Sequence, residues 1–203
     1  MTTPPDIEYF YSAHSAYAYL GAWELERIAA KHNVRVHHRP FDFHPVVNAA
    51  GSQPFKERSA AHVDYFFGRE LIRWAEWRDL PILTYRPTYH DNPLILPNCA
   101  IIAAGDAAGA FSKAVLQAHW RDDADIADPA VLRALATDVG LSGDALLAAP
   151  QTPDVQAQHD ANTIEAAERG IFGSPTYFFG GDMFYGQDSL MMVDRALERP
   201  FAT

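Results

Sequence analysis

The chain has 203 residues, a formal net charge of -10 and an isoelectric point near 5.2. This length suits one domain, or one domain with a sizeable insertion, better than two independent ones. The acidic balance argues against a nucleic-acid partner, because such proteins gather Lys and Arg on one face. The sequence shows neither a signal-peptide pattern, which would predict export, nor a run of about 18 apolar residues, which would predict a membrane span. We therefore expect a cytoplasmic protein without a membrane partner.

The single cysteine, Cys99, limits the chemistry of the chain. One cysteine rules out an internal disulfide, a CxxC dithiol and a cysteine-rich zinc site. Because Cys99 lies in an apolar, helical stretch, we expect a small buried residue rather than a nucleophile. The nine histidines show no HExxH spacing, so no metal site is predicted.

The first fifty residues predict a β-α-β unit. Segment 7–11 is aromatic and β-branched, as in a strand, and apolar residues recur at helical spacing from Tyr19 to Ala29. A second strand is expected from Val34. Since such units are parallel and right-handed, the loop from Ser12 to Ser15 should lie at a strand's carboxyl end beside a helix amino terminus. This loop is the first candidate site.

The middle of the chain, residues 53–149, reads as an all-helical insertion. A helix ends near Asp79, and after Pro97 two further helical runs are expected over 100–118 and 129–139. The proline-rich loop 84–93 carries polar aromatic residues. These features fit a cleft lining or an ordinary connection equally well.

The last quarter predicts α-β-β-α. A helix over 154–169 is followed by strands at 176–179 and 182–185, joined by Gly180-Gly181, and by a last helix that opens near Asp188. Residues 1–52 and 150–203 would then form one α/β domain around the helical insertion.

This order of elements resembles the thioredoxin-like fold of the DsbA and kappa-class glutathione transferase branch. Three segments are similar to the 2-hydroxychromene-2-carboxylate isomerase family: EYFYSAHSAYAYL at 8–20, FGSPTYF at 172–178 and MFYGQDSL at 183–190. In these segments Ser15 takes the family's key serine position and Pro175 that of its cis-proline. Residues 73–75, Arg-Trp-Ala, with a following Leu-Pro, extend the resemblance.

The resemblance implies glutathione as cofactor and Ser15 as the catalytic residue, which stabilises the glutathione thiolate. The implied cofactor-binding residues are Ser15, Ser174, Pro175, Gly186, Gln187 and Asp188. Gln187 and the last helix would accept the γ-glutamyl carboxylate, and Asp188 would pair with the amine. Lys56, Tyr89 and Asn92 are expected to contact an aromatic substrate. A homodimer is also implied.

In the resembling isomerases the thiolate is thought to add reversibly to a chromene or benzylidenepyruvate. A kappa-like transferase, in which the thiolate stays on the substrate, and a non-catalytic binding module remain alternatives. A disulfide oxidoreductase is contradicted by Ser15 and by the lack of a partner cysteine. The chain departs from the family pattern at Ala16, Ala18 and Ser189, which stand in place of proline, serine and arginine.

Overall fold

The computed structural model describes residues 6–52 and 57–202. Four strands form one mixed sheet in the order β2-β1-β3-β4. They are β1 (Ile7–Tyr11), β2 (Val36–Pro40), β3 (Thr176–Phe179) and β4 (Asp182–Tyr185). β1 pairs in parallel with β2, with Ile7 opposite Val36, and antiparallel with β3, with Tyr9 opposite Tyr177. β3 and β4 form the expected hairpin.

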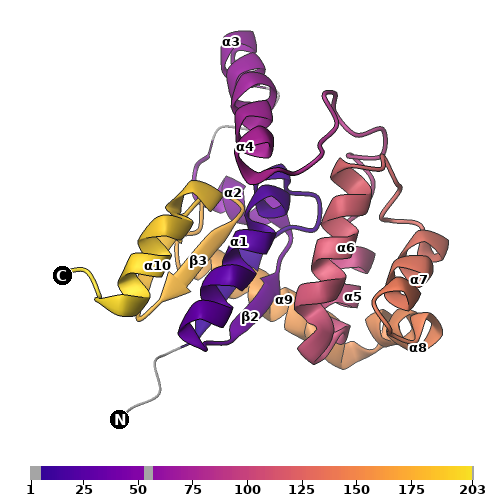
Figure 1. The fold of residues 1–203 in the computed structure, drawn as a ribbon. Helices are drawn as coiled ribbons and strands as arrows, with labels where there is room; N and C mark the ends of the chain where they lie inside the picture. Colours follow the sequence, from indigo (N-terminus) through magenta and orange to yellow (C-terminus); the bar gives the residue numbers. More distant parts are fainter. Residues whose placement is uncertain (1–5, 53–56, 203) are drawn as a thin grey trace.

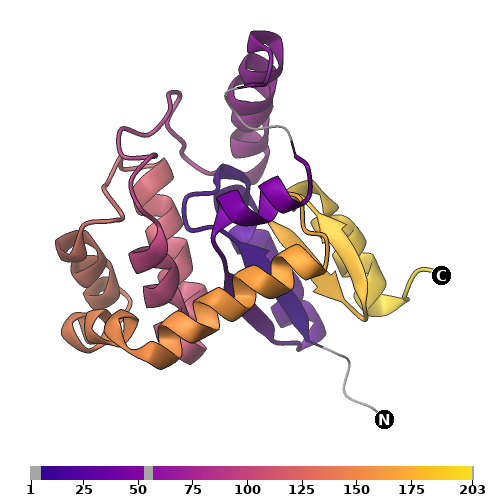
Figure 2. The same ribbon diagram turned by 180° about the vertical axis from the view of Figure 1, so that it is seen from behind.

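The helices surround this sheet and extend to one side of it. In chain order they are α1 (Ala16–His32), α2 (Phe43–Ala49), α3 (Ala60–Val63), the π-helical η2 (Asp64–Arg69), α4 (Glu70–Arg78), α5 (Ile95–Ala103), η3 (Gly105–Ala107), α6 (Ala108–Trp120), α7 (Pro129–Asp138), α8 (Gly143–Ala148), η4 (Ala149–Gln151), α9 (Pro153–Glu168), η5 (Gln187–Ser189) and α10 (Leu190–Glu198). α1 and α10 lie on one face of the sheet (Figure 1), and α9 crosses the other (Figure 2). α3, η2 and α4 project as an arm beyond the sheet, on the side away from both termini (Figure 1).

The sheet divides the core into two apolar layers because successive side chains of β1 point to opposite faces. Tyr9 stacks on Tyr11 and on Tyr177, with ring centroids 4.0 and 5.2 Å apart, in the layer that contains α1 and α6. Phe10 packs with Phe178 in the smaller layer against α9. All five of these rings are buried, as the strand pattern predicts.

Two boundaries differ from the expected ones. β2 begins at Val36, because the Val34 N–H still bonds the Ala29 carbonyl 3.0 Å away and closes the end of α1. The apolar run after Leu94 forms two helices, α5 and α6, bent by 113° to each other. The break falls at Gly105, whose φ of +55° is a left-handed value that glycine adopts without strain. The short helix α2 was not predicted.

No single helix of the described residues is long and apolar enough to cross a bilayer. Taken together, Ile95–Ala103 and Gly105–Trp120 reach that length and composition as a bent pair. Their apolar side chains Cys99, Ile101, Phe111 and Leu116 are buried in the core, which accounts for the composition.

Candidate active site

Ser15 occupies the amino-terminal cap of α1. Its Oγ accepts a hydrogen bond from the Ala18 N–H at 3.2 Å and donates one to the Ser174 carbonyl at 3.1 Å. The hydroxyl is therefore bonded to the amino terminus of α1 on one side and to the backbone of Ser174 on the other. Because the helix dipole is positive at this end, the position favours a negatively charged group.

The segment opposite Ser15 contains the cis peptide bond between Ser174 and Pro175, as the resemblance implies. The Ser174 side chain also contacts the loop from Ser12 to Ser15, called the active loop below. Its Oγ accepts a hydrogen bond from the Ser12 N–H at 3.1 Å. Thr176 fixes the same turn from behind by donating its hydroxyl to the Gly173 carbonyl at 2.9 Å. Backbone and side chain of Ser174 thus both hold the two loops together.

A cavity of about 150 Å³ opens beside this junction. It brings together three predicted residues, Ser174, Gly186 and Asp188, with side chains that the sequence did not single out as ligands. The lining residues are Tyr17, Phe66, Glu70, Trp74, Ser174, Tyr185, Gly186 and Asp188. The arm closes one side of the cavity, because the Tyr17 hydroxyl donates to the Phe66 carbonyl at 2.5 Å.

Gly186 shapes the edge of the cavity at which Asp188 lies. Its φ of +86° and ψ of 151° favour glycine, and a β-carbon there would collide with the Asp188 carboxylate. Asp188 itself is exposed, and no described residue gives it a hydrogen bond or an ion pair. Its carboxylate is therefore open to a cationic group of a ligand.

Gln187 lies behind the cavity rather than in its lining. The side chain is fully buried, and its Oε1 accepts hydrogen bonds from Arg78 Nε at 3.2 Å and Nη2 at 3.0 Å. Arg78 also lies 3.6 Å from the Glu24 carboxylate, and its guanidinium is 5.6 Å from the centre of the Trp74 ring. Sequence reasoning missed Arg78, because nothing in the pattern of α4 indicates a contact with the last helix.

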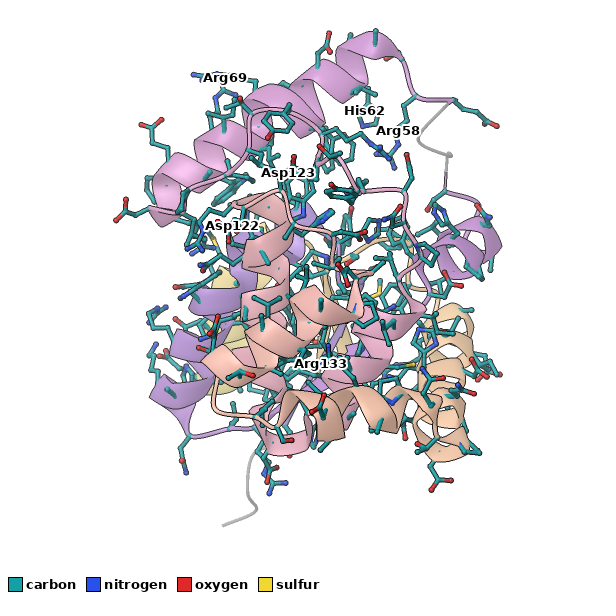
Figure 3. All side chains as sticks on the ribbon, turned by 90° about the vertical axis from the view of Figure 1, so that its right-hand side faces the viewer. Arg58, His62, Arg69, Asp122, Asp123 and Arg133 are labelled. Carbon is teal, nitrogen blue, oxygen red and sulfur yellow. The ribbon has the colours of Figure 1, made fainter. Side chains whose placement is uncertain are left out.

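The predicted substrate residues are dispersed. Lys56 lies outside the described residues. Neither Tyr89 nor Asn92 lines the cavity: Tyr89 is 42% exposed, and Asn92 donates its amide to Asp125 at 2.9 Å. The loop that carries them is pinned by Asp123, labelled in Figure 3, whose carboxylate accepts hydrogen bonds from the N–H and hydroxyl of Thr88, each at 2.7 Å.

The insertion holds the active loop in place. Asn98, on α5, accepts a hydrogen bond from the Ala13 N–H at 3.1 Å and donates one to the Phe41 carbonyl at 3.0 Å. Trp120, at the end of α6, donates its indole N–H to the His14 carbonyl at 2.8 Å. The conformation of the loop thus depends on helices that are distant in sequence.

Cys99 has no place in this site. Its side chain is fully buried on α5, and burial raises the pKa of its thiol to about 11. The expected burial of Cys99 is confirmed. A second cavity, of about 600 Å³ between β2, α1 and α6, includes none of the predicted site residues. We therefore assign the chemistry to the smaller cavity beside Ser15.

The described histidines and carboxylates offer one group with metal-ligand spacing, His32, Asp194 and Glu198. The Lys31 ammonium already bridges the two carboxylates, at 2.8 and 2.9 Å. Such a cation repels a metal ion, so this cluster reads as an ion-pair network.

Known proteins resemble this chain over nearly its whole length. Residues 6–198 match the DSBA-like thioredoxin domain. The chain belongs to the DsbA-like thioredoxin family. Within it, the chain is 29% identical to a 2-hydroxychromene-2-carboxylate isomerase of Sphingobium xenophagum, over 94% of this chain and 97% of the relative. It is 25% identical to the isomerase of that name from Pseudomonas putida, over 95% and 94%.

Solved structures share this fold. A 2-hydroxychromene-2-carboxylate isomerase superposes with a TM-score of 0.83 at 23% identity, over 95% of this chain and 94% of that one. The cytosolic disulfide reductase DsbM from Pseudomonas aeruginosa, in a structure with GSH, gives 0.65 at 18% identity, over 96% and 93%. The thioredoxin-like fold and the resemblance to the isomerase family are thereby confirmed.

Proposed function

We propose that the protein is a glutathione-dependent isomerase that acts on an aromatic substrate of the 2-hydroxychromene-2-carboxylate type. One observation carries the proposal: the Ser15 hydroxyl lies at a helix amino terminus, bonded to the carbonyl that precedes a cis-proline, beside a cavity edged by Asp188. The relatives that carry the isomerase name support the choice of reaction.

The chemistry of the cavity fits glutathione, which carries two carboxylates, an ammonium and a thiol. Asp188 offers an exposed carboxylate to the ammonium. The backbone of Ser174, at the edge of the cavity, can pair with an extended peptide in the manner of a β-strand. Gln187 would support the amino terminus of the last helical segment from behind. When bound, glutathione would supply a thiolate that can add reversibly to a conjugated double bond.

Ser15 would bring a hydroxyl donor to the thiol at the amino terminus of α1, where the helix dipole also favours negative charge. A thiol has a pKa near 8.5, and both a hydroxyl donor and a helix amino terminus favour its charged form. Ser15 therefore acts by stabilising negative charge, and it need not attack the substrate. Tyr17 and Tyr185, which line the cavity, stay neutral near pH 7, because desolvation raises the pKa of both phenols above its usual 10.

Incubation with glutathione and 2-hydroxychromene-2-carboxylate tests the proposal. We expect spectral conversion of the substrate while the thiol concentration stays constant. In Ser15→Ala, loss of a hydrogen bond to a charged group, worth about 1.5–3 kcal/mol, should lower kcat/KM roughly 10- to 100-fold. Ser142→Ala is the matched control, because Ser142 caps α8 in the same way and lies outside the site.

The alternatives predict other outcomes of the same experiment. A stoichiometric loss of thiol with formation of a conjugate would favour a kappa-like transferase. Absence of glutathione binding in calorimetry, with Ser15→Ala indistinguishable from wild type, would favour a non-catalytic module. The homodimer implied by the resemblance stays a prediction, which sedimentation equilibrium can test.

A further inference from the structure

His14, directly before Ser15, has both its backbone and its ring fixed. Its carbonyl accepts the Trp120 indole N–H at 2.8 Å, and its Nδ1 forms a hydrogen bond with the Ser12 Oγ at 2.8 Å. The residue as a whole is half-buried, so part of its surface stays accessible. These bonds fix the orientation of the His14 ring next to Ser15, so the remaining ring nitrogen points in a defined direction.

The position of the ring proton can be argued from the needs of Ser12, because a buried hydroxyl with a single partner satisfies its own proton only by donating to that partner. Ser12 is fully buried, and among the described residues the only partner of its hydroxyl is His14. When the Ser12 hydroxyl donates to Nδ1, the neutral ring carries its proton on Nε2. No described residue bonds Nε2, so this edge can donate to a ligand.

Other histidines surround the ring. His90, from the loop 84–93, lies with its ring centroid 4.6 Å from that of His14, and its Nδ1 is 2.9 Å from Nε2 of the buried His119 on α6. Phe43 on α2 contacts the ring edge-on at 5.9 Å. Through His90, the loop 84–93 thus contacts the residue directly before Ser15.

These surroundings disfavour a charge on His14. Burial, and then the nearby His90, His119, His44 and Arg86, hold the pKa of His14 well below its usual 6.5. The ring is therefore neutral near pH 7. Burial also lowers the pKa of His90 to about 3 and that of His119 to about 4, so these two rings are neutral as well. A neutral imidazole N–H suits an oxygen with partial negative charge, such as a polarised carbonyl.

We propose that Nε2–H of His14 donates a hydrogen bond to the ketone oxygen of a conjugated aromatic keto acid, while Ser12 sets the tautomer of the ring and His90 and His119 support it. This inference rests on the proposed function and names the group of the substrate that this side of the site recognises. His14 would bind and polarise the carbonyl, and Ser15 would serve the thiol. The two residues thus divide the site between substrate and cofactor.

The test uses trans-benzylidenepyruvate labelled with ¹³C at the ketone and the protein without glutathione, so that no turnover is needed. Isotope-edited infrared spectra should show the ketone band shifted to lower frequency on binding. His14→Leu should abolish this shift and weaken binding about 3- to 10-fold, as expected for one neutral hydrogen bond. His14→Gln should restore part of the shift, because its amide also donates. His37→Leu, which removes an exposed histidine paired with Asp6, is the matched control.

Several results would overturn the inference. These are an unshifted ketone band in wild type, an equal shift in His14→Leu, or failure of the wild type to bind the keto acid. Nitrogen-15 spectra of the wild type that place the His14 proton on Nδ1 would do the same, even if a variant failed to fold. The proposed function is scored separately by the thiolate absorbance of glutathione near 240 nm, which Ser15→Ala should reduce and His14→Leu should leave unchanged.

Discussion

Asn98 is the residue through which the insertion should set the conformation of the active loop. The side chain is 1% exposed, bonds Ala13 N–H and the Phe41 carbonyl, and lies 3.3 Å from Nε2 of His159. Asn98→Leu keeps the approximate volume but leaves a buried N–H and a buried C=O without partners, each at about 1–3 kcal/mol. Added apolar burial offsets about 1 kcal/mol, so the free energy of unfolding should fall by roughly 1–5 kcal/mol.

Urea unfolding followed by circular dichroism measures this loss, and thermal unfolding should show a midpoint lower by about 2–4 °C for each kcal/mol. Asn162→Leu provides the matched control. Asn162 is also 1% exposed, donates to the Pro40 carbonyl at 3.0 Å and accepts from Gln158 at 2.9 Å, but no hydrogen bond joins it to the active loop. Both variants should lose stability, while only Asn98→Leu should accelerate amide hydrogen exchange at Ala13 and Ser15.

An Asn98→Leu free energy of unfolding within about 0.5 kcal/mol of wild type, as for neutral surface substitutions, would contradict this role of Asn98. The role would also be contradicted if both variants accelerated exchange in the loop equally. In that case the loop would respond to global stability alone, and Asn98 would have no special part in holding it.

Two further predictions concern buried groups. Burial lowers the pKa of His119 to about 4. The unfolded chain binds a proton at this histidine near pH 6.5, whereas the folded chain does not. The free energy of unfolding should therefore fall by about 2–3 kcal/mol between pH 6.5 and 4. In urea titrations, His119→Gln should lose correspondingly less stability over this range. Cys99, with its pKa raised to about 11, should resist iodoacetamide at pH 7.5 in the folded protein and react in urea; rapid labelling of the native state would contradict its burial.

The sequence predicted those parts of the fold whose signals are local. The strand at 7–11, the hairpin around Gly180-Gly181 and the end of α4 near Asp79 each follow from a short pattern of apolar, glycine or polar residues. The break at Gly105 was not predicted, because alanines, which favour helix, lie on both sides of it. Its consequence is large, since it turns α6 toward α1 and places Trp120 against the active loop.

The candidate site could be predicted only as far as its residues lie in recognisable segments. Ser174, Gly186 and Asp188 come together as expected, because the cis-proline turn and the last helix follow each other closely in the chain. Trp74 and Glu70 reach the same cavity from the arm, and only tertiary packing brings the arm over α1. Gln187 shows the converse case: its segment was recognised, but burial against Arg78 turns its side chain away from the cavity.

Ser15 has two roles that substitution can separate, because its Oγ accepts one hydrogen bond and donates another. The acceptor caps α1, and the proton, which here bonds the Ser174 carbonyl, is the one that would turn to a bound thiolate. Ser15→Ala removes both and should cost about 1 kcal/mol of stability. Ser15→Gly should cost only about a few tenths of a kcal/mol, because glycine is a tolerated cap. Both variants lack the donor. If Ser15→Gly retained wild-type thiolate absorbance of bound glutathione, the cap alone would account for the effect of alanine. Equal loss of the signal in both variants, with unequal stability, would assign the chemistry to the donated proton.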